Sequence, residues 1–187
     1  MKMMVRAFNA SLAQRHRARI VGFALGMVGL MIFSPGVWTQ VPPAGVVVGS
    51  TPFESLRNAA TATRNQAGVV ETTAQGWARN ASSPYYRNDL FLSDFRTMQL
   101  EFNALHQRFN WMGDLALQTG RPYAQNTLAE LEAGLKIIAE QLGFMQQQYA
   151  SGNLTQAALV RACQTCQSLM GEWQEQLRLG CSRMGLF

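Results

Sequence analysis

Beyond residue 51, apolar side chains recur along the chain with alternating spacings of three and four residues. This spacing places them on one face of an α-helix and is typical of helices that pack in a left-handed bundle. No stretch alternates between apolar and polar residues as a half-buried strand does. We therefore predict an all-α fold. Its helices are expected at residues 52–78, 84–118, 126–150 and 154–180.

Each predicted helix carries one seam of core positions. The seams comprise Phe53, Leu56, Ala60, Thr63, Ala67, Val70, Ala74 and Trp77 on the first helix; Phe91, Phe95, Met98, Phe102, Leu105, Phe109 and Met112 on the second; Leu128, Leu131, Leu135, Ile138, Leu142, Met145 and Tyr149 on the third; and Leu159, Ala162, Cys166, Leu169, Trp173 and Leu177 on the fourth. The small residues of the first seam can pack closely against the phenylalanines of the second. Because the loops are short, the expected architecture is an up-down-up-down four-helix bundle over residues 52–187.

Capping signals mark the expected helix ends. Residues Thr51–Glu54 form a capping box with proline in the first turn. Ser83-Pro84 is expected to open the second helix, and Thr127 with Glu130 forms a second capping box at the start of the third. Residues Ser151–Asn153 combine a helix stop with an N-cap for the fourth helix.

The charge of the chain is distributed unevenly. The net charge of +5 arises from 16 Lys and Arg against 11 Asp and Glu, and the first carboxylate is Glu54. Beyond residue 40 there are eleven basic and eleven acidic side chains. The basic excess therefore belongs to the N-terminal segment and does not indicate a nucleic-acid-binding surface.

That N-terminal segment has the pattern of an export signal. Its basic side chains precede an apolar run from Ile20 to Phe33, which predicts export across a membrane. The run is shorter than the roughly 20 residues that span a bilayer, unless Ser34–Trp38 is counted with it. Residues 1–40 are therefore interpreted as a signal peptide or an N-terminal membrane anchor. Residues 41–51 show no helical period and are expected to form an extended linker or arm.

Few residues in the chain are suited to catalysis. His106 is the only histidine after residue 16, and no Glu-x-x-His pair is present, which excludes the di-iron site of ferritin-like bundles. A catalytic triad could be built only around His106, and there is no glycine-rich phosphate loop. We predict that the protein is not an enzyme and uses no cofactor or metal. A cytochrome-like bundle would need His106 and a methionine as axial ligands.

All three cysteines lie on the fourth predicted helix, so no disulfide between them can join two helices. Cys163 and Cys166 form a C-x-x-C pair, but Gln167 stands where covalent haem attachment needs histidine. Cys181 is too far along a continuous helix to bridge to Cys166. Three interpretations stay open: buried inert thiols, a local Cys163–Cys166 disulfide, and a metal or redox function.

One local string is more specific than these features. The sequence from Pro84 to Leu92 reads P-Y-Y-R-N-D-L-F-L. It resembles the start of the second helix in the PsbQ family, the extrinsic lumenal proteins of photosystem II, where the pattern reads roughly W-P-x-x-x-N-D-L-x-L. The chain departs from that pattern because six residues separate Trp77 from Pro84, and its domain has a single lysine, Lys136.

The resemblance implies a membrane-associated protein of the thylakoid lumen, addressed there by its export signal. Such a protein docks on the photosystem II core and other extrinsic subunits and stabilises the oxygen-evolving complex without catalysis. The expected partner-binding residues are Tyr85, Tyr86, Arg87, Asn88 and Asp89, because aromatic residues and arginine are enriched in interface cores. The alternative is a membrane-anchored sensor or adaptor domain in a bacterial periplasm, built as a four-helix bundle.

Overall fold

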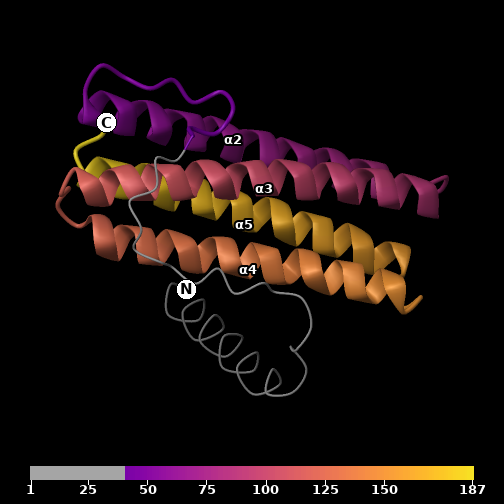
Figure 1. Ribbon diagram of the computed structural model, residues 1–187. Coiled ribbons are helices and arrows are strands. Elements are labelled where there is room, and N and C mark those ends of the chain that lie inside the picture. Colours follow the sequence, from indigo (N-terminus) through magenta and orange to yellow (C-terminus); the bar gives the residue numbers. More distant parts are fainter. Residues whose placement is uncertain (1–40) are drawn as a thin grey trace, which may run out of the picture. The chain divides into compact units, whose positions relative to one another are not determined.

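The computed structural model describes residues 41–187. The segment predicted to be a signal peptide or anchor, residues 1–40, lies outside the described residues. The described part contains the helices α2 (Pro52–Ala81), α3 (Asn88–Gln118), α4 (Ala124–Ala150) and α5 (Gln156–Arg183), and no strand. These helices pack together along their lengths (Figure 1), with contacts between α2 and α3, α2 and α5, α4 and α5, and α3 and α4. The all-α prediction is confirmed for these residues.

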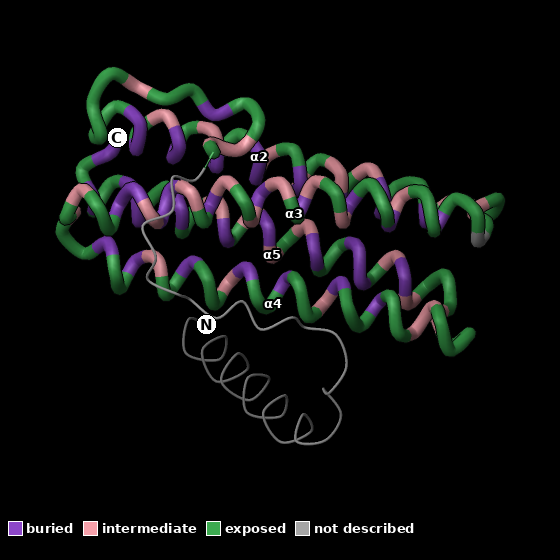
Figure 2. Tube along the Cα trace, in the orientation of Figure 1, coloured by how far each residue is buried: buried purple, intermediate pink, exposed green. Residues whose placement is uncertain are grey.

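The predicted seams form the core between the helices (Figure 2). Every seam position of α3, from Phe91 to Met112, is buried. The first seam has one exception, since Phe53 is 38% exposed; the Arg121 guanidinium lies over its ring, at 4.0 Å from the ring centroid. The other seam positions that are only partly buried are Leu128, Tyr149 and Leu169.

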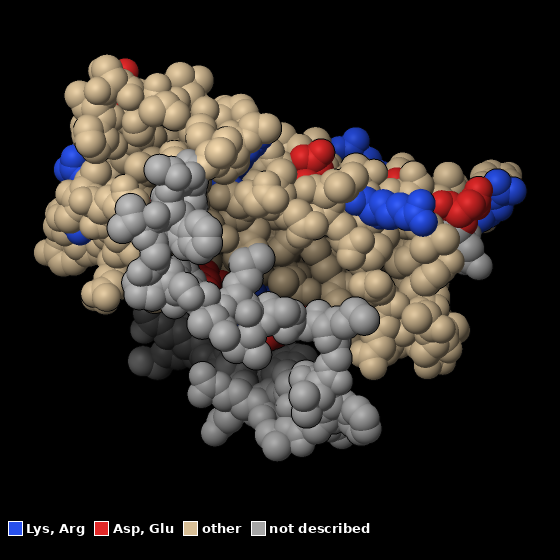
Figure 3. Space-filling model, viewed as in Figure 1, with Lys and Arg blue, Asp and Glu red and all other residues tan. Residues whose placement is uncertain are grey.

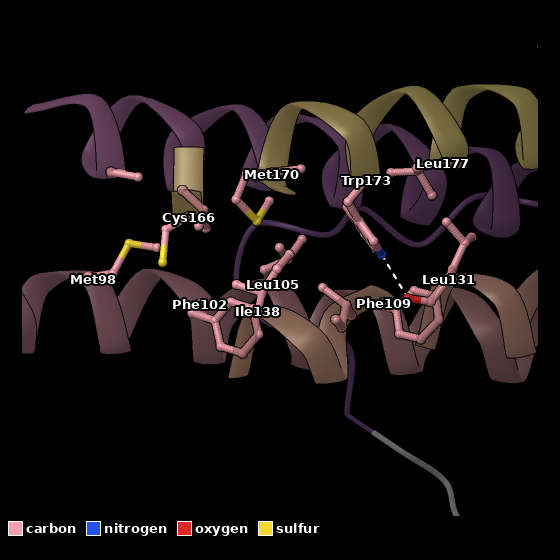
Figure 4. Close-up of a cluster of buried hydrophobic side chains, with 14 of the residues drawn as sticks. Met98, Phe102, Leu105, Phe109, Leu131, Ile138, Cys166, Met170, Trp173 and Leu177 are labelled. Carbon is pink, nitrogen blue, oxygen red and sulfur yellow. Dashed lines mark hydrogen bonds between the residues drawn. The ribbon is translucent and has the colours of Figure 1, made fainter. Parts of the chain in front are cut away.

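Trp173 joins α5 to α4 in the middle of this core (Figure 4). Its indole N–H donates to the Leu131 carbonyl at 2.8 Å, and its ring meets the edge of Phe109 at a centroid distance of 6.0 Å. The ring lies over Gly134, where a Cβ atom would stand only 2.7 Å from Trp173 Cδ1. A glycine on α4 thus makes room for the largest buried side chain of α5.

The predicted start of α2 is confirmed in position, and α5 begins two residues later than expected, at Gln156. The Thr51 hydroxyl accepts from the Glu54 N–H at 3.1 Å, as a capping box requires. The Glu54 carboxylate accepts from the backbone N–H of Ser50 at 2.8 Å and from its hydroxyl at 2.6 Å. These hydrogen bonds lower the pKa of Glu54. On α5 the N-cap is Thr155, whose hydroxyl accepts from the Ala158 N–H at 3.2 Å, and not Asn153.

The starts of α3 and α4 differ from the prediction. Ser83 and Pro84 form a turn, closed by the Tyr86 N–H on the Ser83 carbonyl at 3.1 Å, and α3 begins only at Asn88. The prediction that Thr127 and Glu130 form a capping box at the start of α4 is wrong. Tyr123, in the left-handed region with φ of 60°, already caps α4, so Thr127 lies inside the helix and is buried against α5.

Residues 41–51 lie against α2 and α3 (Figure 1). Arg108 of α3 donates to the Ala44 carbonyl at 3.0 Å and to the Gln66 side-chain oxygen of α2 at 2.7 Å. Asn58 donates to the Val47 carbonyl at 3.2 Å, and Val46 is only 9% exposed. Side-chain hydrogen bonds from both helices therefore hold the segment that was expected to be an extended linker or arm.

Candidate functional site

The residues predicted to bind a partner lie on the turn between α2 and α3 and on the first turn of α3. Tyr85 is 83% exposed, the largest fraction of any described tyrosine. Arg87 and Asp89 are exposed and form an ion pair of 3.0 Å between Nη2 and Oδ2. The side chain of Asn88 lies outside the described part of the structure. The face shown in Figure 3 is mostly uncharged, and its charged side chains gather toward this end of α2 and α3.

Tyr86 has a different environment from its neighbours. It is half-buried, and its hydroxyl accepts from the Trp77 indole N–H at 2.8 Å and donates to Asp94 Oδ2 at 3.0 Å. Burial raises the pKa of the Tyr86 phenol, and the negative charge of Asp94 raises it further. The phenol is therefore protonated at neutral pH and serves to fix the turn onto both helices.

Three side chains that the sequence analysis did not single out, Asp94 among them, complete this turn. Asn80 donates to the same Asp94 oxygen as Tyr86, at 3.2 Å. Gln156 of α5 reaches across and donates to the backbone carbonyls of Ala81 at 2.9 Å and Ser83 at 2.6 Å. The signal for Asp94 was present, because an acidic residue directly beside the Phe95 seam position needs hydrogen-bond donors. No sequence signal pointed to Gln156, since it contacts residues more than 70 positions away.

An aromatic cluster supports the turn from inside the bundle. The ring of Trp77 lies 5.7 Å from Phe91 and 5.9 Å from Phe95, measured between centroids. Phe91 stacks in turn on Tyr149 of α4, at 4.1 Å and an interplanar angle of 17°. Such contacts stabilise aromatic pairs by roughly 0.5–1.5 kcal/mol beyond simple burial. The exposed residues Tyr85 and Arg87 are thus presented from a rigid base.

The remaining candidate residues are His106 and the three cysteines. His106 is half-buried on α3, and within residues 41–187 no group of three or more His, Cys, Asp or Glu side chains is arranged to hold a metal ion. Cys163, Cys166 and Cys181 are free and fully buried. Burial raises the pKa of Cys166 and of Cys181 to about 12, and it also raises the pKa of Cys163, beside Cys166 and Asp94. This arrangement favours the interpretation as inert core thiols over a disulfide or a redox function.

We expect the cysteines of the folded full-length chain to resist alkylation. With iodoacetamide at pH 8, the native protein should react at least about a hundredfold more slowly than the chain in guanidinium chloride, because the thiolate is the reactive species. Mass spectrometry of samples taken at intervals measures the modification at each cysteine. Rapid labelling of Cys163 or Cys166 in the folded protein would instead indicate an accessible, activated thiol.

In the part of the chain that the structure describes, no helix is both long enough and apolar enough to span a bilayer. Comparisons of the chain with models of protein families, with curated proteins and with solved structures found no match. The likeness to the PsbQ family therefore rests on features of the sequence, chiefly the string from Pro84 to Leu92.

Proposed function

We propose that this protein is a non-enzymatic subunit that docks on the lumenal side of photosystem II and stabilises the oxygen-evolving complex. The observation that carries the proposal is the exposure of Tyr85, Arg87 and Asp89 on a turn that the Trp77–Tyr86–Asp94 hydrogen bonds hold in place. These residues belong to the string that resembles the PsbQ pattern. The partner of this protein would be the photosystem II core together with the other extrinsic subunits.

The geometry of the turn suits protein binding. Exposed aromatic rings and arginine side chains supply much of the energy in protein interfaces. Because Tyr85 projects from a turn that is already ordered, less conformational entropy is lost on docking. The domain beyond residue 40 has equal numbers of basic and acidic side chains, so long-range attraction contributes little. Binding should therefore rest on local contacts and depend only moderately on salt.

The architecture we propose for this role is an up-down-up-down four-helix bundle. Residues 1–40 would be the export signal or anchor that addresses it to the thylakoid lumen, and residues 41–51 the arm that follows. Helices adjacent in the chain pack against each other, as do α2 and α5. The connections 82–87, 119–123 and 151–155 are short, which favours antiparallel neighbours.

Replacing Tyr85 and Arg87 together with alanine should abolish retention on photosystem II membranes while leaving the fold intact. Both side chains are exposed, so each change should alter the free energy of unfolding by less than about 0.5 kcal/mol. The full-length double variant is compared with the wild type in a membrane sedimentation assay, after circular dichroism has established equal melting temperatures. Tyr86 is left unchanged because its hydroxyl joins α2 to α3.

A matched control replaces an exposed tyrosine and an exposed arginine with alanine at the opposite ends of the helices. Tyr123 is 70% exposed on the α3–α4 connection, and Arg57 is exposed near the start of α2. Alanine at both positions should leave retention unchanged.

Equal retention of the Tyr85/Arg87 variant and the wild type would mean that the interface lies elsewhere, and residues 41–50 would be the next segment to test. If the wild type has no affinity for these membranes, the photosynthetic assignment is wrong and an anchored periplasmic sensor or adaptor domain becomes the better account.

A further inference from the structure

A cleft lies where α2 ends and α3 begins. Its volume is about 280 Å³, and the residues that line it are Asn80, Ser83, Tyr85, Tyr86, Leu90 and Asp94. Sites for drug-sized ligands occupy roughly 300–1,000 Å³. The cleft is therefore of a size to receive one long side chain.

The carboxylate of Asp94 gives this cleft its charge. Its Oδ2 atom accepts from the Tyr86 hydroxyl at 3.0 Å and from Asn80 at 3.2 Å. Among the described groups, which do not include the Asn88 side chain, none donates a hydrogen bond to its Oδ1 atom, and no Lys or Arg forms an ion pair with Asp94. The nearby Arg87 is paired with Asp89 instead. Asp94 thus lines the cleft without a cationic partner among the described groups.

The walls of the cleft suit the stem of a basic side chain. Leu90 is 44% exposed and offers an apolar surface, while the ring of Tyr85, at 83% exposure, offers a face for cation–π contact. Lysine and arginine bury their methylene stems on such surfaces and keep the charged group at a polar site. The Trp77–Tyr86 hydrogen bond and the two bonds from Gln156 hold the turn that carries Tyr85 in position before any partner arrives.

We propose that this cleft receives a single arginine or lysine side chain of the partner protein, with its cation on Asp94 Oδ1 and its stem between Tyr85 and Leu90. This inference rests on the proposed docking function and specifies the chemistry of the partner's contact. Arginine fits best, because a planar guanidinium can bond the carboxylate and lie on the phenol ring together. The partner is thereby expected to carry an exposed basic residue on a projecting segment.

The test uses the full-length, ¹⁵N-labelled chain in a zwitterionic detergent and two small probes. N-acetylarginine amide carries the guanidinium, and N-acetylcitrulline amide has nearly the same shape without the charge. Titration with the arginine probe should shift the amide resonances of residues 80–94 in a saturable way. The citrulline probe should leave those resonances unchanged or require at least about a tenfold higher concentration, because charge-assisted hydrogen bonds are roughly twice as strong as neutral ones.

Two variants connect the shifts to the cleft. Asp94→Asn removes the charge but keeps a side chain of the same shape, and it should weaken the arginine-induced shifts by about tenfold or more. Tyr85→Ala removes an exposed wall without touching the hydrogen bonds of Tyr86, and it should weaken them severalfold. The control is Glu132→Gln, an exposed carboxylate on α4 that should have no effect. Absence of saturable shifts, or equal shifts with citrulline or with Asp94→Asn, would overturn the inference.

Membrane retention of Asp94→Asn separates this inference from the proposed function. Loss of retention together with loss of arginine binding supports both. Normal retention of Asp94→Asn on photosystem II membranes would leave docking in place and refute the cleft as the contact. Saturable arginine binding in a wild type that has no affinity for those membranes would support the cleft and refute the photosynthetic partner.

Discussion

Phe95→Ala is expected to lower the free energy of unfolding by about 3–5 kcal/mol, the range for removing a large aromatic side chain from a packed core. Phe95 is 5% exposed, and its ring stacks on Phe91 at 5.6 Å and meets Trp77 edge-on at 5.9 Å. Alanine would leave a cavity beneath the α2–α3 turn, and the helices around it could close it only in part. Phe102→Ala, in the middle of the same seam, should cost a similar amount.

Leu100 provides the matched control because it is an apolar residue of the same helix that is 69% exposed. Leu100→Ala should change the free energy of unfolding by less than about 0.5 kcal/mol, and so should a change at Gln99. Urea denaturation of the full-length variants, followed by circular dichroism, measures the differences. If Leu100→Ala and Phe95→Ala destabilise the protein equally, the assignment of the buried face of α3 is wrong.

Gly180→Ala should destabilise the protein by about 1–3 kcal/mol, although alanine forms helices better than glycine. Gly180 is buried on α5, and a Cβ atom there would overlap the Cγ2 methyl group of Thr127. Thr127 is itself buried and branched at Cβ, so it can move aside only by leaving its preferred rotamer or by displacing α4. The glycine is what lets α4 and α5 approach at this level.

Gly143→Ala is the control, and its effect should have the opposite sign. Gly143 is an exposed helical residue of α4, and a Cβ atom there would meet nothing within 4 Å. Alanine should raise the free energy of unfolding by roughly 0.5–1 kcal/mol, because it lowers the conformational freedom of the unfolded chain and favours the helix. If both substitutions stabilise the protein, α4 and α5 do not approach as closely as the structure shows.

The helices and most of their core faces could be predicted from the sequence. The periodic spacing of apolar residues reports burial directly, because one face of a helix must leave water wherever the helix packs. It is for this reason that all of the α3 seam is buried, and that the first turn of α2 follows its capping signal at Thr51. Both features depend on residues within one or two helical turns.

The buried C-terminal residues were missed because they depend on the end of α5. The chain turns after Arg183, with Gly185 in the left-handed region at φ of 71°, and this turn brings Met184 and Leu186 into the core. The helix was expected to end near residue 180. Helix ends are set by a few weak local hydrogen bonds, and tertiary burial of the following residues can shift them by a turn.

The sequence by itself determined which residues form helices, which faces those helices bury, and which string of residues resembles a photosystem subunit. The tertiary structure decided the roles within that string. It set Tyr85 and Arg87 toward solvent, joined Tyr86 to Trp77 and Asp94 by hydrogen bonds, and placed Asp94 in the lining of a cleft. Periodicity reports only the burial of a position along one helix. Hydrogen bonds between α2, α3 and α5 join residues far apart in the chain, so their partners exist only once the helices have packed.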